Sequence, residues 1–245
     1  MKIPFFRSLA ESRGPGSAED LQPGLPAADE VHLWRVHLDV PAPALAALAA
    51  TLAPDEQARA ARFVREQDRA RFVACRAALR AVLAGYAGLP AECCWFGYTA
   101  HAKPFLLGPP ALTRLQFNLS HSDGLALVAV ACDRPVGVDL EGIRPEVDMS
   151  GVGRLVFSQV ERDALDGVPE ADYLTAFFDL WTRKEAYLKC RGLGFSGSPA
   201  QITVGSAGEE GRCFVANVCP APGYAAALAV EGGWSHLRCA DWDCP

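Results

Sequence analysis

The sequence lacks the features that mark a zinc protein, a disulfide-stabilised protein or a membrane-spanning protein. Its nine cysteines are an odd number, and no two of them stand in a C-x-x-C spacing. No stretch approaches the ~20 consecutive apolar residues that span a bilayer. The first residues, MKIPFFRSLAESRGPGS, also lack the apolar run of a secretory signal. We therefore expect a reduced, cytoplasmic protein that does not associate with membranes.

An excess of basic residues is also missing. The chain has 23 Lys and Arg residues against 29 Asp and Glu residues, a net charge of -6. This balance argues against a general nucleic-acid binder, because phosphate contacts require a basic surface. With 50% hydrophobic and 21% charged residues, the composition is that of an ordinary globular protein. A length of 245 residues allows one large domain or two small ones.

Hydrophobic periodicity divides the chain into a leader and two halves. Residues 1–29 are rich in Gly, Pro, Ser and Ala without a period, and they predict a flexible leader. Each half then reads as a strand, a short helix, a long helix and further strands. The first half predicts strand 31–40, helix 54–66, a helix capped by Asp68 that ends at Gly88, and strands 115–120 and 124–132. The second half predicts strand 135–141, helices 157–165 and 171–190, and strands 201–205, 212–219 and 224–232.

This repeated order predicts an α+β fold with two similar lobes related by pseudo-two-fold symmetry. The lobes would be residues 30–134 and 135–245, each a small antiparallel sheet packed with a long helix. A single continuous sheet would contradict this prediction. Because one chain with an internal duplication would supply both lobes, we expect a monomer.

The stretch VGVDLE, residues 136–141, places two acids on one face of an apolar strand. Alternate residues of a strand share a face, so Asp139 and Glu141 lie ~7 Å apart along it. The ordinary explanation for two acids on one strand face is that this face of the sheet is exposed to solvent. The alternative is that the two carboxylates share a cation.

A second acid-bearing motif, WTRKEAYLK, lies on the long helix of the second half. Glu185 and Lys189 are four residues apart on one helix face, and an exposed salt bridge would explain this pair alone. If Glu185 also met Asp139 and Glu141, each pair at ~7 Å would cost ~2 kcal/mol at an effective dielectric of 20. A divalent cation removes that cost, and oxygen ligands favour Mg²⁺ or Mn²⁺. The joint pattern therefore predicts a magnesium-dependent reaction of a phosphate.

The ordered motifs GVDLE, FS-x-x-E and W-x-x-K-E-A-x-x-K, with KPFL and FNLSHS upstream, resemble the signature of the surfactin-type 4'-phosphopantetheinyl transferases. The resemblance extends from about residue 31 to the final strands. It implies transfer of the phosphopantetheine arm of coenzyme A to a serine of an apo acyl or peptidyl carrier protein, with release of adenosine 3',5'-bisphosphate. Such a holo-acyl-carrier-protein synthase would serve polyketide, nonribosomal peptide or fatty-acid synthesis.

The resemblance also implies roles for individual residues. Asp139, Glu141 and Glu185 would hold Mg²⁺, Glu185 would help to deprotonate the carrier serine, and Lys189 would be catalytic and contact the phosphate. Coenzyme A would lie between the lobes and be bound by Arg71, Lys103, Ser120, His121 and Lys189. Local sequence alone explains Ser120 and His121 as turn residues, and Arg71 as a surface arginine.

Two further assignments remain open from the sequence. Glu161 completes a capping box with Ser158, whereas the resemblance places an acid here near the metal. Arg183, Lys184 and Arg191 are candidates for docking an acidic carrier protein, or they are solvated surface residues. Two other functions fit parts of the pattern, a non-catalytic module that binds coenzyme A or a carrier protein, and a magnesium-dependent phosphohydrolase. The presence of all three acids together with Lys189 favours the transferase.

Overall fold

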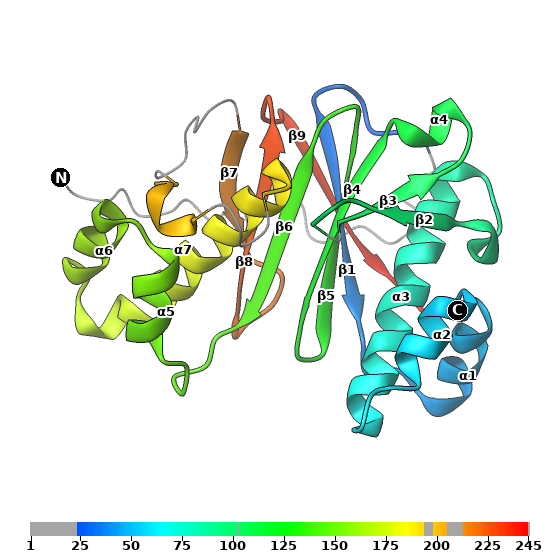
Figure 1. The fold of residues 1–245 in the computed structure, drawn as a ribbon, viewed down its shortest axis with the longest axis horizontal. Coiled ribbons are helices and arrows are strands. Elements are labelled where there is room, and N and C mark those ends of the chain that lie inside the picture. The colour runs from blue at the N-terminus through cyan, green and yellow to red at the C-terminus, as the bar shows by residue number, and fades with distance from the viewer. Residues whose placement is uncertain (1–23, 102, 194–197, 205–212, 245) are drawn as a thin grey trace.

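The computed structural model describes residues 24–101, 103–193, 198–204 and 213–244. The larger part of the predicted leader, residues 1–23, lies outside these ranges. Two sheets stand in the centre of the molecule, and helices cover their outer sides (Figure 1). The first half contains β1 (Glu30–His37), α1 (Ala42–Ala50), α2 (Pro54–Ala60), α3 (Glu66–Ala87), β2 (Trp95–Tyr98), β3 (Pro104–Leu107), α4 (Pro110–Thr113), β4 (Leu115–Ser122) and β5 (Leu125–Cys132). The second half contains β6 (Val136–Gly142), α5 (Met149–Val156), α6 (Gln159–Asp166), α7 (Glu170–Arg191), β7 (Cys213–Val218), β8 (Tyr224–Glu231) and β9 (His236–Trp242).

The strands form two main sheets and a separate hairpin, β2–β3. The first sheet has the order β4-β5-β1-β9 and the second the order β6-β8-β7. Neighbouring strands are antiparallel except for β1 and β9, which are parallel. The predicted α+β fold with two lobes is confirmed. Strand β9, however, lies in the sheet of the first lobe, whereas the sequence-based division assigns its residues to the second.

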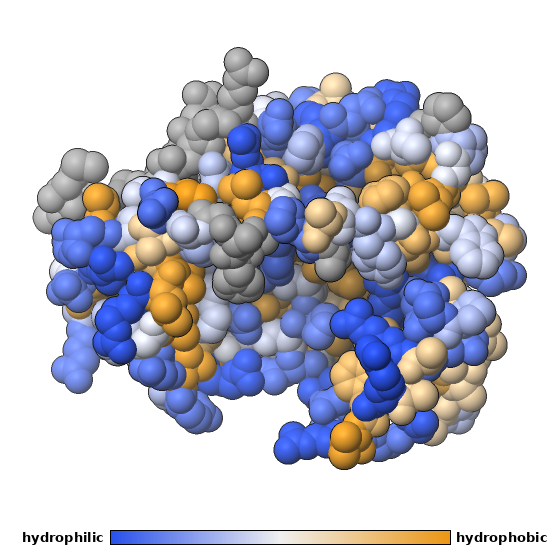
Figure 2. All heavy atoms as spheres, viewed as in Figure 1, coloured by the Kyte–Doolittle hydropathy of each residue, from blue (hydrophilic) through white to orange (hydrophobic). Residues whose placement is uncertain are grey.

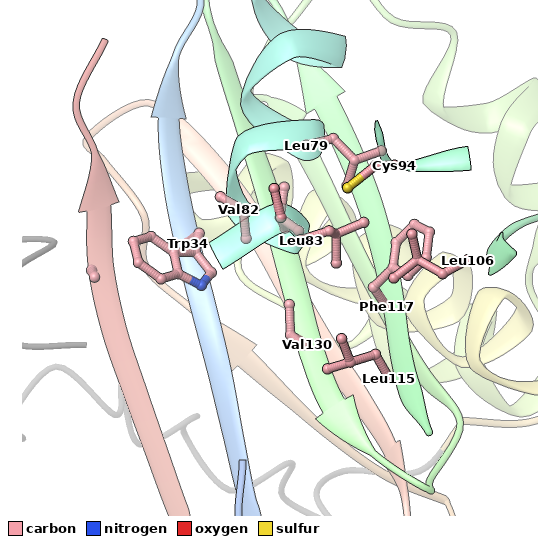
Figure 3. Packing of buried hydrophobic residues seen from close by; sticks show 12 residues of the cluster. Trp34, Leu79, Val82, Leu83, Cys94, Leu106, Leu115, Phe117 and Val130 are labelled. Atoms are coloured by element: carbon pink, nitrogen blue, oxygen red, sulfur yellow. The ribbon is translucent and has the colours of Figure 1, made fainter. Parts of the chain in front are cut away.

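The two sheets bury their facing sides against each other. Val31 and Leu127 of the first sheet belong to the same buried cluster as Val138 and Leu228 of the second. The other face of the first sheet packs on α3, through Trp34, Leu83 and their neighbours (Figure 3). Because it is covered on both faces, β1 is buried along most of its length. It therefore lacks the solvent-exposed face of a surface strand.

The two long helices occupy corresponding places in the two lobes. Helix α3 packs on the outer face of the first sheet, and α7 packs on the outer face of the second through Ala186 and Leu188. Each helix has 22 residues. Each ends at a glycine in the left-handed conformation, Gly88 with φ 63° and Gly192 with φ 65°, a conformation that glycine adopts without steric cost. This correspondence agrees with the predicted repeat of pattern.

Several predicted elements differ from the structure. Helix α1 occupies a stretch expected to be a connection, and helix α2 is shorter than predicted. Helix α3 begins at Glu66, so Asp68 lies in its first turn and is not its cap. The strand predicted at 201–205 is not formed by the described residues of that segment, which follow a 3-10 turn at Pro199–Gln201.

Backbone groups around the missing strand bond to side chains instead of to a neighbouring strand. The carbonyl oxygens of Pro199 and Ile202 accept hydrogen bonds from Lys184 Nζ, and the amide of Val204 donates to Glu161 Oε1 at 2.7 Å. These contacts satisfy buried polar groups without a ladder.

The β2–β3 hairpin has one packed face and one exposed face. Phe96 packs on Phe117, with ring centroids 5.8 Å apart. Trp95, Phe105 and Leu107 remain 59%, 43% and 49% exposed, and hydrophobic atoms are visible over the hairpin in Figure 2. The hairpin is therefore anchored to the first lobe by one face only.

All nine cysteines lie in described residues and are free thiols. Across the described ranges, no helix combines the length and the apolar character needed to cross a membrane.

Candidate active site

The site is built where helix α7 lies directly on strand β6. A Cβ atom at Gly137 would stand 2.1 Å from the carbonyl oxygen of Ala186 and 2.4 Å from the amide nitrogen of Cys190. No larger residue fits at that distance, so the glycine permits the close approach. Asp139 and Glu141 follow at alternate positions of the same strand. In this order of residues, Gly137 allows α7 to pack closely on β6, and Asp139 and Glu141 then lie next to that contact.

Asp139 is the centre of a buried polar cluster. It is 4% exposed, and its Oδ1 atom accepts hydrogen bonds from Lys189 Nζ at 2.5 Å and from Ser120 Oγ at 3.0 Å. Lys189 Nζ also donates to Ser120 Oγ at 3.1 Å and to the carbonyl of Val138 at 3.3 Å. Three elements, β4, β6 and α7, therefore meet at one ion pair.

Glu185 lies one turn before Lys189 on α7 and is 8% exposed. Burial raises its pKa to about 7, helped by the negative charges of Asp139 and Glu141 and opposed by Lys189. Burial and the charge of Asp139 also raise the pKa of Glu141, whose Oε2 atom accepts a hydrogen bond from Ser122 Oγ at 3.1 Å. The charge of Asp139 thus disfavours the charged forms of both glutamates.

The carboxylate oxygens of Asp139, Glu141 and Glu185 are the candidate ligands of a divalent cation. Asp139 Oδ2 and Glu185 Oε1 are buried and have no hydrogen-bond partner among the described residues, and the ligands offered are carboxylate oxygens, which suit Mg²⁺ or Mn²⁺. As they stand, no three His, Cys, Asp or Glu side chains of the described segments are gathered closely enough to hold one ion. The residues fit a hard dication in chemistry and charge, and their side chains would have to turn toward a common point to bind it.

Ser120 and His121 follow each other on β4 and have different surroundings. Ser120 is buried and bonded within the cluster around Asp139. The pKa of His121 is lowered by desolvation and by the positive charges of Lys189 and Arg59. His121 therefore belongs to a cationic neighbourhood that suits an anion.

Lys103 reaches the site from the first lobe, but its ammonium group bonds to backbone. Lys103 Nζ donates to the carbonyl oxygens of Val136 at 3.0 Å and Lys189 at 2.9 Å. Burial lowers its pKa. The carbonyl of Lys189 is among the last of α7, where a cation is favourable. The lysine thus joins the start of β6 to the end of α7.

Arg71 is paired with an acid of its own lobe. Its Nε and Nη2 atoms donate to the two carboxylate oxygens of Asp39 at 2.7 and 2.9 Å. A Cβ atom at Gly124 would stand 3.5 Å from Arg71 Nη2, so Arg71 lies beside the turn between β4 and β5.

The contacts bear on two assignments left open by the sequence. Ser158 and Glu161 form the predicted capping box, and Glu161 Oε2 also forms a buried ion pair with Lys184 Nζ at 2.7 Å. Lys184 is 0% and Arg183 1% exposed. The prediction that these two residues lie on a docking surface is therefore wrong, because a helix residue that faces the core offers no charge to a partner. Arg191 is exposed.

Sequence reasoning missed three residues around the site. Asn118 and Ser122 flank Ser120 at alternate positions of β4 and bond to β6, and Arg59 acts on His121. The alternation Asn-x-Ser-x-Ser within an otherwise apolar strand is the signal that indicates the first two. Arg59 stands among several arginines, and its sequence context does not distinguish it.

Comparisons with known proteins agree with this arrangement. Residues 135–228 match the family model described as 4'-phosphopantetheinyl transferase superfamily, and residues 41–133 match the model described as 4'-phosphopantetheinyl transferase, N-terminal. The chain is 45% identical over 168 residues to the 4'-phosphopantetheinyl transferase HetI of Nostoc sp., covering 69% of this chain and 71% of that protein.

Two relatives from Bacillus species are more distant. The 4'-phosphopantetheinyl transferase psf-1 of Bacillus pumilus is 30% identical over 187 residues, 72% of this chain and 78% of that protein. The 4'-phosphopantetheinyl transferase of Bacillus subtilis is 28% identical over 148 residues, 60% of this chain and 63% of that protein. The two family models meet near residue 134, between β5 and β6, where the two halves of the site join. The chain therefore belongs to the 4'-phosphopantetheinyl transferase superfamily.

Proposed function

We propose that this protein transfers the 4'-phosphopantetheine arm of coenzyme A to a serine of an apo acyl or peptidyl carrier protein. The observation that carries the proposal is the buried cluster in which Lys189, Ser120 and Asp139 meet beside Glu185 and Glu141. Membership of the superfamily supports the choice of substrates. In the reaction, the serine oxygen forms a bond to the phosphorus next to pantetheine, and adenosine 3',5'-bisphosphate leaves with the bridging oxygen.

Asp139, Glu141 and Glu185 would hold Mg²⁺, or Mn²⁺ in its place. When bound, the ion would neutralise charge on the pyrophosphate oxygens of coenzyme A. The two unpartnered carboxylate oxygens and the raised pKa values of the two glutamates support this assignment. Catalysis would then depend on positioning and charge neutralisation, as is general for phosphoryl transfer.

The chain's own side chains would supply the proton transfer and the remaining positive charge. Glu185, which is buried beside Asp139 and Glu141, would accept the proton of the carrier serine. Lys189 already forms an ion pair within the site and would turn toward the transferred phosphate. His121 would meet the 3'-phosphate, because the positive charges of Lys189 and Arg59 act at its position.

The present contacts of Lys103 and Arg71 modify the roles that resemblance implies for them. Lys103 would position the backbone at the site, since both its observed bonds are to carbonyls of β6 and α7. Arg71 would bind the phosphate only by leaving Asp39. Carrier proteins of polyketide, nonribosomal peptide or fatty-acid synthesis are the proposed partners, and a cytoplasmic monomer is the proposed state.

Incubation of the full chain with coenzyme A, Mg²⁺ and a panel of apo carrier proteins tests this function. Intact mass spectrometry should show one phosphopantetheine added to a carrier serine, and a chelator should prevent the addition. Carriers that all remain unmodified would contradict the proposal. Cleavage of coenzyme A without any carrier would instead indicate a phosphohydrolase.

Asp139→Asn should abolish most of the transfer while the protein stays folded. The substitution keeps the size of the side chain and removes the charge that pairs with Lys189. Loss of one electrostatic element of an active site costs about 10²–10³-fold in kcat. Transfer rates and circular dichroism should be measured together, and near-normal turnover would refute the role of Asp139.

A further inference from the structure

Strand β6 is an edge strand of the second sheet, and its free edge faces β4 of the first lobe. In the order β6-β8-β7 only β8 pairs with β6, so alternate amides of β6 point away from the ladder. Such amides are costly when they are buried without an acceptor. The edge of β6 therefore needs acceptors from outside its own sheet.

Side chains of β4 supply these acceptors in regular order. Asn118 Oδ1 accepts from the amide of Val138 at 2.8 Å. Two residues further along each strand, Ser120 Oγ accepts from Leu140 at 3.3 Å, and Ser122 Oγ then accepts from Gly142 at 3.0 Å. We call Asn118, Ser120 and Ser122 the interlobe ladder. It fixes the register of one lobe against the other by side chain to backbone bonds.

Two of the three rungs also hold an acid of the site. A serine hydroxyl can accept from a backbone amide and donate its hydrogen elsewhere. Ser120 Oγ donates to Asp139 Oδ1 at 3.0 Å, and Ser122 Oγ donates to Glu141 Oε2 at 3.1 Å. The Asn118 rung holds no acid, because the corresponding position of β6 is Gly137. Asn118 and Ser122 therefore differ in one respect. Both accept a hydrogen bond from a β6 amide, but only Ser122 also donates one to an acid, Glu141.

We propose that Ser122 is a positioning residue that holds Oε2 of the Glu141 carboxylate, so that Oε1 is the atom that turns toward the divalent cation. The register of β6 is set by three rungs, and two of them remain when one is removed. The proposal rests on the function proposed above. The side chain of Glu141 is 25% exposed. Its charged partner is Arg144, whose Nη2 atom lies 3.8 Å from Glu141 Oε2 and whose side chain is 49% exposed. Ser122 is 6% exposed. The hydrogen bond from the buried serine therefore restrains this carboxylate more than the longer, exposed ion pair with Arg144 does.

Direct binding of Mn²⁺ to the full chain with coenzyme A present, followed by electron paramagnetic resonance, separates positioning from general support. Ser122→Ala should raise the Mn²⁺ dissociation constant about 10–100-fold, the usual effect of removing a partner of a ligating carboxylate. Ser122→Thr keeps the hydroxyl group and should restore the affinity. Asn118→Ala is the matched control, because it removes a rung that touches no acid, and its Mn²⁺ affinity should stay within about two-fold of wild type.

The kinetic readout should agree with the binding. In Ser122→Ala the Mg²⁺ concentration for half-maximal rate should rise, and much of kcat should return at saturating Mg²⁺. Wild-type Mn²⁺ affinity in Ser122→Ala, or equal weakening in Asn118→Ala, would overturn the positioning role while the transferase function stands. Absence of Mn²⁺ binding and of transfer in the wild type would overturn both. If Ser122→Ala does not fold, failure of the folded Ser122→Thr variant to bind Mn²⁺ like wild type overturns the role as well.

Discussion

Glu185 is the residue whose surroundings most disfavour its charge. Its pKa is raised from 4.5 to about 7 by burial and by Asp139, so the native state binds a proton more tightly than the unfolded chain does. Without metal, the stability of the wild-type protein should be highest below pH 4.5 as far as this group is concerned. It should fall as the pH rises to about 7, by roughly 3 kcal/mol in total.

Glu185→Gln removes this dependence and should be the more stable protein above pH 7. Its advantage should shrink as the pH falls and approach zero below pH 4.5, because the wild-type carboxyl is then protonated in both states. Urea unfolding in the presence of a chelator at pH 5 and pH 8 measures the difference. The exposed Glu170→Gln is the control. An advantage of equal size at both pH values would contradict the origin assigned to the shift.

Gly137 is the residue that sets the distance between β6 and α7. In Gly137→Ala the added methyl group would overlap backbone atoms of Ala186 and Cys190, which cannot move away as a side chain can. We expect a loss of about 1–3 kcal/mol in the free energy of unfolding, together with reduced transfer, because α7 carries Glu185 and Lys189.

Gly85→Ala provides the matched control for that substitution. Gly85 lies inside α3 with nothing within 4 Å of its added Cβ, so alanine there should stabilise the protein by about 0.5–1 kcal/mol. Urea denaturation of both variants gives the comparison. If Gly137→Ala were as stable as wild type, the close packing of helix on strand would not be required.

At the scale of elements, α6, α7 and the segment 199–204 are joined by one buried ion pair. Lys184→Ala would leave the carboxylate of Glu161, 4% exposed, without its charged partner. The expected loss is about 3–5 kcal/mol in the free energy of unfolding. Arg69→Ala removes an exposed ion pair with Glu66 and should cost at most about 0.5 kcal/mol. Equal losses in thermal or urea unfolding would show that burial does not set the value of these pairs.

Helix ends and caps set by neighbouring residues were predicted from the sequence, whereas the pairing of a strand with a distant partner was not. The capping box at Ser158 and the end of the long helix near residue 190 depend on neighbouring residues, and both predictions are confirmed. Strand β9 instead pairs in parallel with β1, about 200 residues earlier in the chain, and no local signal identifies that partner. Helix α1 was missed although alanine, its main residue, favours helices.

The same distinction applies to the site. The spacing of Glu185 and Lys189 on one helix face predicts their proximity, and the order of motifs predicts that they meet Asp139. Periodicity does not tell which charged residues of α7 face the core, so Arg183 and Lys184 were assigned to the surface. Ser122 was missed because its role depends on the position of β6 beside β4, which only the packed lobes define.

At the scale of the whole molecule, the two lobes share one core. Val31 and Leu127 of the first sheet pack in one cluster with Val138 and Leu228 of the second. Strand β9, from the second half of the sequence, pairs with β1 in the first sheet. A fragment of residues 30–134 would expose this apolar face and leave β1 as an open edge. Such a fragment lacks the burial that stabilises a small domain.

We therefore expect the full chain to unfold in a single transition and residues 30–134 alone to show no cooperative unfolding. Near-ultraviolet circular dichroism and tryptophan fluorescence of the full chain should give coincident urea curves, because Trp34 reports on the first lobe and Trp181 on the second. Mixing the fragment with residues 135–245 should restore native signals, since the second fragment supplies both the facing sheet and β9. A cooperative transition of residues 30–134 alone would show that the division at residue 134 separates independent folding units.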